Sequence, residues 1–126
     1  MLSLDSVELY YDHVYALKGV SIDLSEGETV ALIGANGAGK SSILRAITGL
    51  RRIRSGSITY MGERLDGRPA AEIVRRGIAM VPEGRRVFPL MSVRDNLLMG
   101  AFTRTDKAGI AQTLESVLAR FPRLRE

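Results

Sequence analysis

A glycine-rich loop between an apolar run and a helical pattern constrains this chain more than any other feature. Residues 34–41 read GANGAGKS and fit the spacing G-x-x-x-x-G-K-S/T in full. The apolar run 29–33 directly before the loop predicts a strand buried on both faces. After the loop, Ile43, Ile47 and Leu50 share one face of a predicted helix. A strand, a tight loop and a helix in this order indicate an α/β fold.

The residue types in this loop suit the binding of a phosphate chain. Glycines allow backbone angles that point successive N–H groups at phosphate oxygens, and the N-terminus of the following helix attracts an anion. We expect the Lys40 ammonium to bridge the β- and γ-phosphates and the Ser41 hydroxyl to bind Mg²⁺. The predicted nucleotide-binding residues of the loop are Gly34, Asn36, Gly37, Ala38, Gly39, Lys40, Ser41 and Ser42.

The composition narrows the class of protein. Among 126 residues there are 18 Lys and Arg, 14 Asp and Glu and no Cys, so disulfide frameworks and cysteine metal sites are excluded. The start of the chain lacks the pattern of a signal peptide, and no apolar run is long enough to span a membrane. Short arginine clusters, such as 51–54 and 85–86, are interpreted as solvated surface. No recognition motif accompanies them, so we expect no nucleic-acid partner.

The remaining elements follow from periodicity and from turn residues. Strands are expected at 7–9, 20–24 and 57–61, and a second doubly buried strand at 78–81. Helices are expected at 69–77, 93–100 and 106–120. Ser92 and Asp95 form a predicted capping pair for the second of these helices, and Pro122 ends the last one.

Two stretches resemble a known family. The segment LIGANGAGKSSILRAITGL resembles the Walker A region of ABC-type ATPases. The segment MVPEGRRVFPLMSVRDNLLMGAF resembles the ATP-binding subunits of branched-chain amino acid uptake transporters and of their urea and amide relatives. A GTPase is disfavoured because N-K-x-D is absent and the one D-x-x-G, at 106–109, begins a predicted helix.

The resemblance implies an α/β, P-loop NTPase fold of the ABC ATPase type. Residues 1–92 would form the nucleotide-binding core with an N-terminal antiparallel β subdomain, and 93–126 the beginning of a helical subdomain. The hydrolytic motifs of the family are absent from this sequence: an apolar strand ending in Asp-Glu (Walker B), an L-S-G-G-Q signature and a switch histidine. We therefore expect an ATPase as the parent protein and an inactive, incomplete domain here, with open apolar strand edges that favour association.

The resemblance also assigns roles to single residues. Tyr11 would stack on adenine, with Tyr10 as the neighbouring candidate and a core tyrosine as the alternative. Glu83 stands at the position of the family's Q-loop glutamine and would bind Mg²⁺; the alternative is a loop glutamate paired with Arg85 or Arg86. Asn96 matches a family asparagine without an assigned role.

Two further positions need comment. Asp12 stands where relatives often have glycine, and His13 is expected in a surface loop.

The implied cofactors are ATP and Mg²⁺, and the implied partners are two kinds of subunit. Transmembrane permease subunits would contact residues 83–99, although 88–91 equally fits core packing. A second ATP-binding subunit would complete a head-to-tail dimer. The implied location is the cytoplasmic face of the inner or plasma membrane, as a peripheral subunit. The expected function is energising the uptake of branched-chain amino acids or similar solutes, with a non-hydrolysing fragment or a urea or amide transporter subunit as alternatives.

Overall fold

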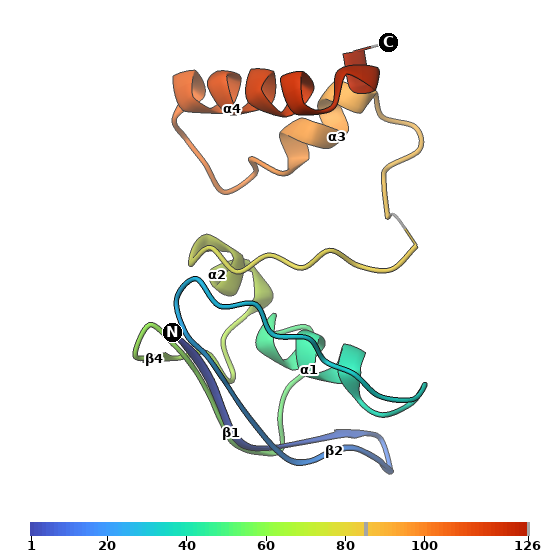
Figure 1. The fold of residues 1–126 in the computed structure, drawn as a ribbon, viewed down its shortest axis with the longest axis vertical. Coiled ribbons are helices and arrows are strands. Elements are labelled where there is room, and N and C mark those ends of the chain that lie inside the picture. The colour runs from blue at the N-terminus through green and yellow to red at the C-terminus, as the bar shows by residue number, and fades with distance from the viewer. Residues whose placement is uncertain (85, 126) are drawn as a thin grey trace. The chain divides into compact units, whose positions relative to one another are not determined.

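Four antiparallel strands form the sheet that carries the first half of the chain (Figure 1). The computed structural model describes residues 1–84 and 86–125. The strands run in the order β2-β1-β3-β4, and their bounds are Leu2–Tyr11 (β1), Val14–Leu24 (β2), Ser55–Tyr60 (β3) and Glu63–Arg64 (β4). The predicted strands near 7–9, 20–24 and 57–61 are confirmed, and the short β4 was missed.

A bulge explains how β1 buries residues that do not alternate. Leu4 and Val7 are both buried although they are three positions apart, which a regular strand would place on opposite faces. The pairing with β2 shifts between these two residues, and Ser6 has a φ of 49°. The extra residue turns Val7 back to the face of Leu4. The bulge therefore gives one sheet face to the core.

The β1–β2 hairpin closes through Asp12 and His13, which are both exposed. Asp12 has a φ of 52°, the left-handed region that glycine favours and that aspartate tolerates better than most residues. The turn thus forms with aspartate at the position where the resemblance suggests glycine. His13 lies in this surface turn, as predicted.

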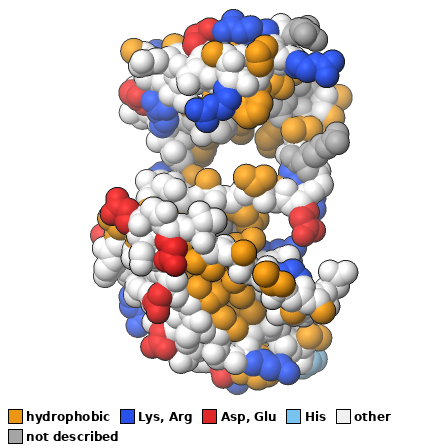
Figure 2. Space-filling view, in the orientation of Figure 1, with side chains coloured by type: hydrophobic (Ala, Val, Ile, Leu, Met, Phe, Trp, Pro, Cys, Tyr) orange, Lys and Arg blue, Asp and Glu red, His pale blue; other side chains and the backbone are white. Residues whose placement is uncertain are grey.

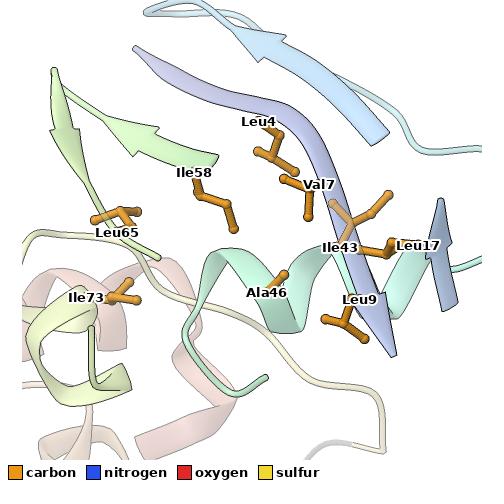
Figure 3. Close-up of a cluster of buried hydrophobic side chains, with 9 residues drawn as sticks. All are labelled: Leu4, Val7, Leu9, Leu17, Ile43, Ala46, Ile58, Leu65 and Ile73. Carbon is orange, nitrogen blue, oxygen red and sulfur yellow. The ribbon is translucent and has the colours of Figure 1, made fainter. Parts of the chain in front are cut away.

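Helices α1 (Lys40–Ile47) and α2 (Ala70–Arg75) complete the first unit, Met1–Met80. Figure 3 shows the core that the sheet and these helices enclose. It consists of Leu4, Val7, Leu9, Leu17, Ile43, Ala46, Ile58, Leu65 and Ile73. Burial of this apolar surface is the main source of stability for the unit.

Helix α1 is shorter than the predicted helix that included Leu50. Gly49 has a φ of 70° and its N–H donates to the Ala46 carbonyl, which ends the helix in a left-handed turn. A Cβ at Gly49 would lie 2.9 Å from the Arg68 carbonyl oxygen, so only glycine fits here. Leu50 follows the turn and is 53% exposed, so its predicted place on the buried helix face is wrong.

The two predicted buried strands, 29–33 and 78–81, are not strands in this structure. Neither segment pairs with another strand among the described residues, and Ile33 and Val81 are 95% and 94% exposed. Leu32 and Ile78 pack only partly against the core. A strand needs a hydrogen-bonded neighbour, and the part of the chain that is described offers these segments none. Figure 2 shows hydrophobic side chains exposed on the surface of the first unit.

The second unit, Val81–Glu126, is helical. Helices α3 (Val93–Met99) and α4 (Lys107–Arg120) and the 3₁₀ turn η1 (Pro122–Arg125) lie within it. The predicted helices at 93–100 and 106–120 are confirmed. Ser92 accepts a hydrogen bond from the Asp95 N–H and donates one to the Asp95 carboxylate, as the capping pair predicted. The division into two units falls after Met80, and the predicted boundary after residue 92 stays a prediction.

Candidate functional site

The loop at 34–41 is held against strand β2 by a glycine. Gly37 and Gly39 have φ values of 86° and 93°, which L-residues rarely adopt. A Cβ at Gly39 would lie 2.8 Å from both the Ala16 carbonyl oxygen and the Leu17 Cδ2. The loop therefore reaches this position only with glycine at 39, and the glycine spacing in the sequence reflects that close approach.

The N-terminus of α1 faces the loop with unpaired donors. Within the described residues, no oxygen accepts a hydrogen bond from the N–H groups of Lys40, Ser41 or Ser42. The first turn carries no acidic side chain, and the N-cap residue Gly39 offers no side-chain acceptor. The partly positive end of the helix is thus free to bind an anion.

Lys40 is folded back over the start of the loop. Its Nζ donates to the carbonyl oxygens of Gly34 at 2.7 Å and Ala35 at 2.8 Å. An ammonium has three donors, so one remains after these two bonds. The two loop carbonyl groups therefore keep the Lys40 ammonium close to the N-terminus of α1.

The other predicted loop residues surround this charge. Asn36, Ala38 and Ser41 are exposed, and the Ala38 N–H donates to the Ala35 carbonyl at 3.1 Å. Ser42 is buried, and its hydroxyl points at the Tyr11 hydroxyl at 3.4 Å. Ser41 is therefore the hydroxyl available to a metal ion, whereas Ser42 faces the protein.

The side chain of Tyr11 contacts the first two turns of α1. Its hydroxyl contacts Ser42 and accepts from Arg45 Nη1 at 3.3 Å, and the Arg51 guanidinium carbon lies 4.9 Å from the ring centroid. Burial alone would raise the pKa of the Tyr11 hydroxyl. The hydrogen bonds from Ser42 and Arg45 and the two arginine charges outweigh burial, so this pKa lies below its usual value. An aromatic ring, a phosphate-type loop and a free helix end thus occur together.

The sequence model of the family described as ABC transporter matches residues 17–124. The chain belongs to the ABC transporter family.

Relatives in this family align with the whole chain. BraG of Pseudomonas aeruginosa, a high-affinity branched-chain amino acid transport ATP-binding protein, is 51% identical over 100% of the chain and 54% of its own length. LivF of Archaeoglobus fulgidus, a probable branched-chain amino acid transport ATP-binding protein, is 31% identical over 99% of the chain and 52% of its own length. The chain thus spans about half the length of these relatives.

Solved structures confirm the fold class. The ATP-binding subunit of an ABC transporter matches with a TM-score of 0.83 at 33% identity, over 99% of this chain and 51% of that one. A dimeric ATP-binding cassette bound to ADP and Pi matches with a TM-score of 0.80 at 23% identity, over 94% and 56%. The fold is therefore that of a partial ABC ATPase.

Other predicted site residues of this ABC transporter family member are placed differently. Tyr10 stacks on Tyr15 with ring centroids 4.3 Å apart and lies 5.1 Å from the Arg54 guanidinium carbon, so its ring already has protein neighbours. Glu83 is exposed in the second unit, and Arg86 Nε donates to its backbone carbonyl at 3.3 Å. Arg85, the other candidate partner of Glu83, lies outside the described residues.

Arg45 and Arg51 are not predicted from the sequence as neighbours of Tyr11, because an arginine on a helix or in a turn usually indicates solvated surface. Their spacing from Tyr11 carries no local signal, so only the fold brings them to it.

No role is assigned to Asn96 from the sequence, and its contacts are seen only in the structure. Its side-chain Oδ1 accepts from one N–H in the backbone of 88–92, and three carbonyl oxygens of this stretch lie within hydrogen-bond distance of Nδ2, which shares its two hydrogens among them. Among the described residues, no helix has the length and apolar character needed to cross a membrane.

Proposed function

We propose that this chain is the nucleotide-binding portion of an ATPase subunit that drives uptake of branched-chain amino acids. The observation that carries the proposal is 51% identity to BraG over the whole chain, with a complete phosphate-type loop in place. The chain spans about half of that relative, so the activity, solute and partners are proposed for the whole protein.

In the proposed complex, the phosphates of ATP lie in the loop at 34–41. The unpaired N–H groups of Lys40, Ser41 and Ser42 donate to phosphate oxygens, as helix N-termini do for anions. The Lys40 ammonium keeps a donor for the β- and γ-phosphates while its bonds to Gly34 and Ala35 hold it in place. These features fit a polyphosphate.

The proposed magnesium site depends on the nucleotide. The described residues hold no cluster of three or more His, Cys, Asp and Glu, so the protein alone offers no complete metal site. Mg²⁺ commonly takes one or two protein ligands together with phosphate oxygens and water. The exposed Ser41 hydroxyl is proposed as one such ligand. Glu83 is proposed as another only because it stands at the position of the family's Q-loop glutamine. Bound Mg²⁺ neutralises charge on the phosphates.

Tyr11 is the proposed platform for the base. Its hydroxyl is anchored to Ser42 and Arg45, so the ring is held at a fixed place near the loop. Tyr11 packs partly against the core and stays partly exposed, and a purine is proposed to stack on the exposed part of its ring. Such stacking adds affinity without selecting one base.

Hydrolysis is proposed for the parent protein and not for these 126 residues. The sequence contains no Walker B Asp-Glu, signature motif or switch histidine, so no residue is available to polarise the attacking water. The parent subunit would pair head to tail with a second ATP-binding subunit. It would contact the permease subunits through residues 83–99, as a peripheral subunit at the cytoplasmic face of the membrane.

Calorimetric titration of the chain with ATP and Mg²⁺ tests the nucleotide site. Lys40→Ala is expected to weaken binding at least about tenfold, because a charge-assisted hydrogen bond contributes roughly 1.5–3 kcal/mol. Lys107→Ala, which removes an exposed lysine at the start of α4, is the matched control and should leave the affinity unchanged. Equal binding by the Lys40 variant would show that the loop does not hold the phosphates. Steady ATP turnover that disappears in Lys40→Ala would refute the absence of hydrolysis.

The solute is tested on the full-length subunit with its permease in proteoliposomes. We expect ATP-driven uptake of leucine, isoleucine or valine and no uptake of urea. Uptake of urea or an amide in place of these amino acids would replace the proposed solute, and no ATP-driven uptake at all would favour the non-hydrolysing alternative.

A further inference from the structure

We propose that Asn96 is a positioning residue that holds the exposed turn 88–91 in the shape presented to the permease subunit. The inference rests on the permease contact proposed above and adds to it the residue that sets the geometry of the contact. Asn96 itself is half-buried behind the turn, at the start of the second turn of α3.

The Asn96 amide binds the turn as a neighbouring strand would. Its Oδ1 accepts from the Phe88 N–H at 2.8 Å, and its Nδ2 lies 3.0 Å from the Phe88 carbonyl oxygen. The same Nδ2 reaches the carbonyl oxygens of Met91 at 3.2 Å and Ser92 at 2.9 Å. One side chain therefore satisfies both backbone polar groups of Phe88 and ties both ends of the turn to α3.

The turn itself is closed by a hydrogen bond and carries an apolar tip. The Met91 N–H donates to the Phe88 carbonyl at 3.1 Å, and Pro89 restricts φ at the second turn position. Leu90, at the third position, is 99% exposed. An apolar side chain held fully in water on an ordered turn gains no packing within this unit. Contact with another subunit would bury this side chain.

The surroundings of the turn extend this apolar surface. Val87, Phe88 and Val93 are also exposed, and a groove of about 470 Å³ lies beside the turn. The groove is lined by Arg86, Val87, Phe88, Pro89, Met91, Val93, Asn96, Leu97 and Leu124. Asn96 thus lines the groove and binds the turn, so a change in its hydrogen bonds alters this surface.

Substitutions at position 96 differ in which of these hydrogen bonds they can keep. Asn96→Asp keeps an acceptor for the Phe88 N–H but sets a carboxylate against three carbonyl oxygens. Asn96→Ala removes all of the bonds. Ser92 caps α3 through Asp95 and not through the turn, so Ser92→Ala loosens the helix start while leaving the amide pair with Phe88 intact.

Hydrogen exchange on the chain measures the turn directly. Asn96→Ala is expected to speed exchange of the Phe88 amide at least about tenfold, since this amide loses its acceptor, the Asn96 Oδ1. Asn96→Asp keeps that acceptor but repels three carbonyl oxygens, so it is expected to loosen the turn and speed exchange of the Met91 amide, which donates to the Phe88 carbonyl. Ser92→Ala should speed exchange at Asp95 and leave Phe88 protected. If Phe88 stays protected in Asn96→Ala, the amide does not hold the turn and the proposal is wrong.

Binding of the full-length subunit to its permease in detergent tests the role in docking. Leu90→Ser and Asn96→Ala are each expected to weaken this binding at least about tenfold, about 1.4 kcal/mol. Their affinity for ATP should stay within about twofold of wild type, a split that general unfolding would not produce. Gln112→Ala, which removes an exposed amide from α4, is the matched control and should bind normally.

The two failures are distinguishable. Normal binding by Leu90→Ser would show that the turn is not the permease contact, which overturns the proposed contact and this inference together. Weak binding by Leu90→Ser with normal binding by Asn96→Ala or Asn96→Asp would leave the contact in place and overturn only the role of Asn96.

Discussion

The two units of this chain keep their shapes by different means. Nine of the ten buried apolar side chains among the described residues belong to Met1–Met80, and only Leu114 belongs to the second unit. In the first unit, a sheet and two helices enclose a shared core (Figure 3). Packing of this kind determines many positions at once.

The second unit relies on polar side chains that bind backbone and neighbouring side chains. Ser92 caps α3, Asn96 holds the preceding turn, and Arg104 makes a two-point ion pair with Asp106 while donating to Thr113 at 2.9 Å. Each such bond contributes only about 1 kcal/mol. The phosphate-type loop is therefore supported by a packed hydrophobic core. The proposed permease contact is instead held by a few hydrogen bonds, each of which a single substitution can remove.

The largest expected effect comes from truncating one buried side chain in each unit. Ile58→Ala, at a side chain with 0% exposure, should cost roughly 2–5 kcal/mol of unfolding free energy. Leu114→Ala, at 8% exposure and as the one buried apolar side chain among the described residues of the second unit, should cost less and affect only that unit. Urea unfolding monitored by hydrogen exchange measures the stability of each unit separately. Equal loss of protection across both units in Leu114→Ala would mean that they fold as one body.

A pair of glycine substitutions separates packing from backbone strain within the first unit. Gly77→Ala meets no atom within 4 Å at a φ of 91°, so we expect only the left-handed cost of roughly 1–2 kcal/mol. Gly49→Ala adds contacts of 2.9 Å with the Arg68 carbonyl and 2.8 Å with Ile73 Cδ1, which should cost at least about 1 kcal/mol more. Thermal unfolding of both variants measures the difference, and equal losses would argue against tight packing at Gly49.

Loss of a helix cap should be visible in the second unit alone. Ser92→Ala removes the acceptor for the Asp95 N–H and should cost about 1 kcal/mol of local stability in α3. Amide exchange in 93–99 measures this cost. Faster exchange in β1 or β3 of the same variant would contradict the independence of the two units.

The smallest expected effect depends on pH. Hydrogen bonding from Arg64 holds the pKa of the Asp66 carboxyl below its usual value, and the Ile58 N–H also donates to this carboxylate at 3.1 Å. A lowered pKa means that the carboxylate stabilises the fold above its unfolded pKa of about 3.9, and that this stability is lost as pH falls through the folded pKa.

Urea midpoints between pH 6 and pH 3 measure this linkage. The stability difference between wild type and Asp66→Asn should be largest at pH 6 and should shrink below about pH 4. A difference that stays constant over this range would show that the carboxylate charge does not act on the β3–β4 turn.

Sequence by itself determined the features that depend on neighbours along the chain. The glycine spacing at 34–41, the capping pair of Ser92 and Asp95, and the helical periods of α1 and α4 were readable because turns, caps and helices close bonds over a few residues. Boundaries were less certain, as Leu50 shows, because the stop at Gly49 depends on a close approach to Arg68 and Ile73.

Tertiary structure decided whatever needs a partner distant in the sequence. The apolar runs at 29–33 and 78–81 have strand composition but no paired neighbour among the described residues, and composition cannot supply an interstrand hydrogen bond. The contacts of Tyr11 with Arg45 and Arg51, across more than thirty positions, likewise arise only when α1 packs against the hairpin. The physical reason is the same in each case: local bonds form wherever their residues occur, whereas long-range contacts exist only once the chain has folded.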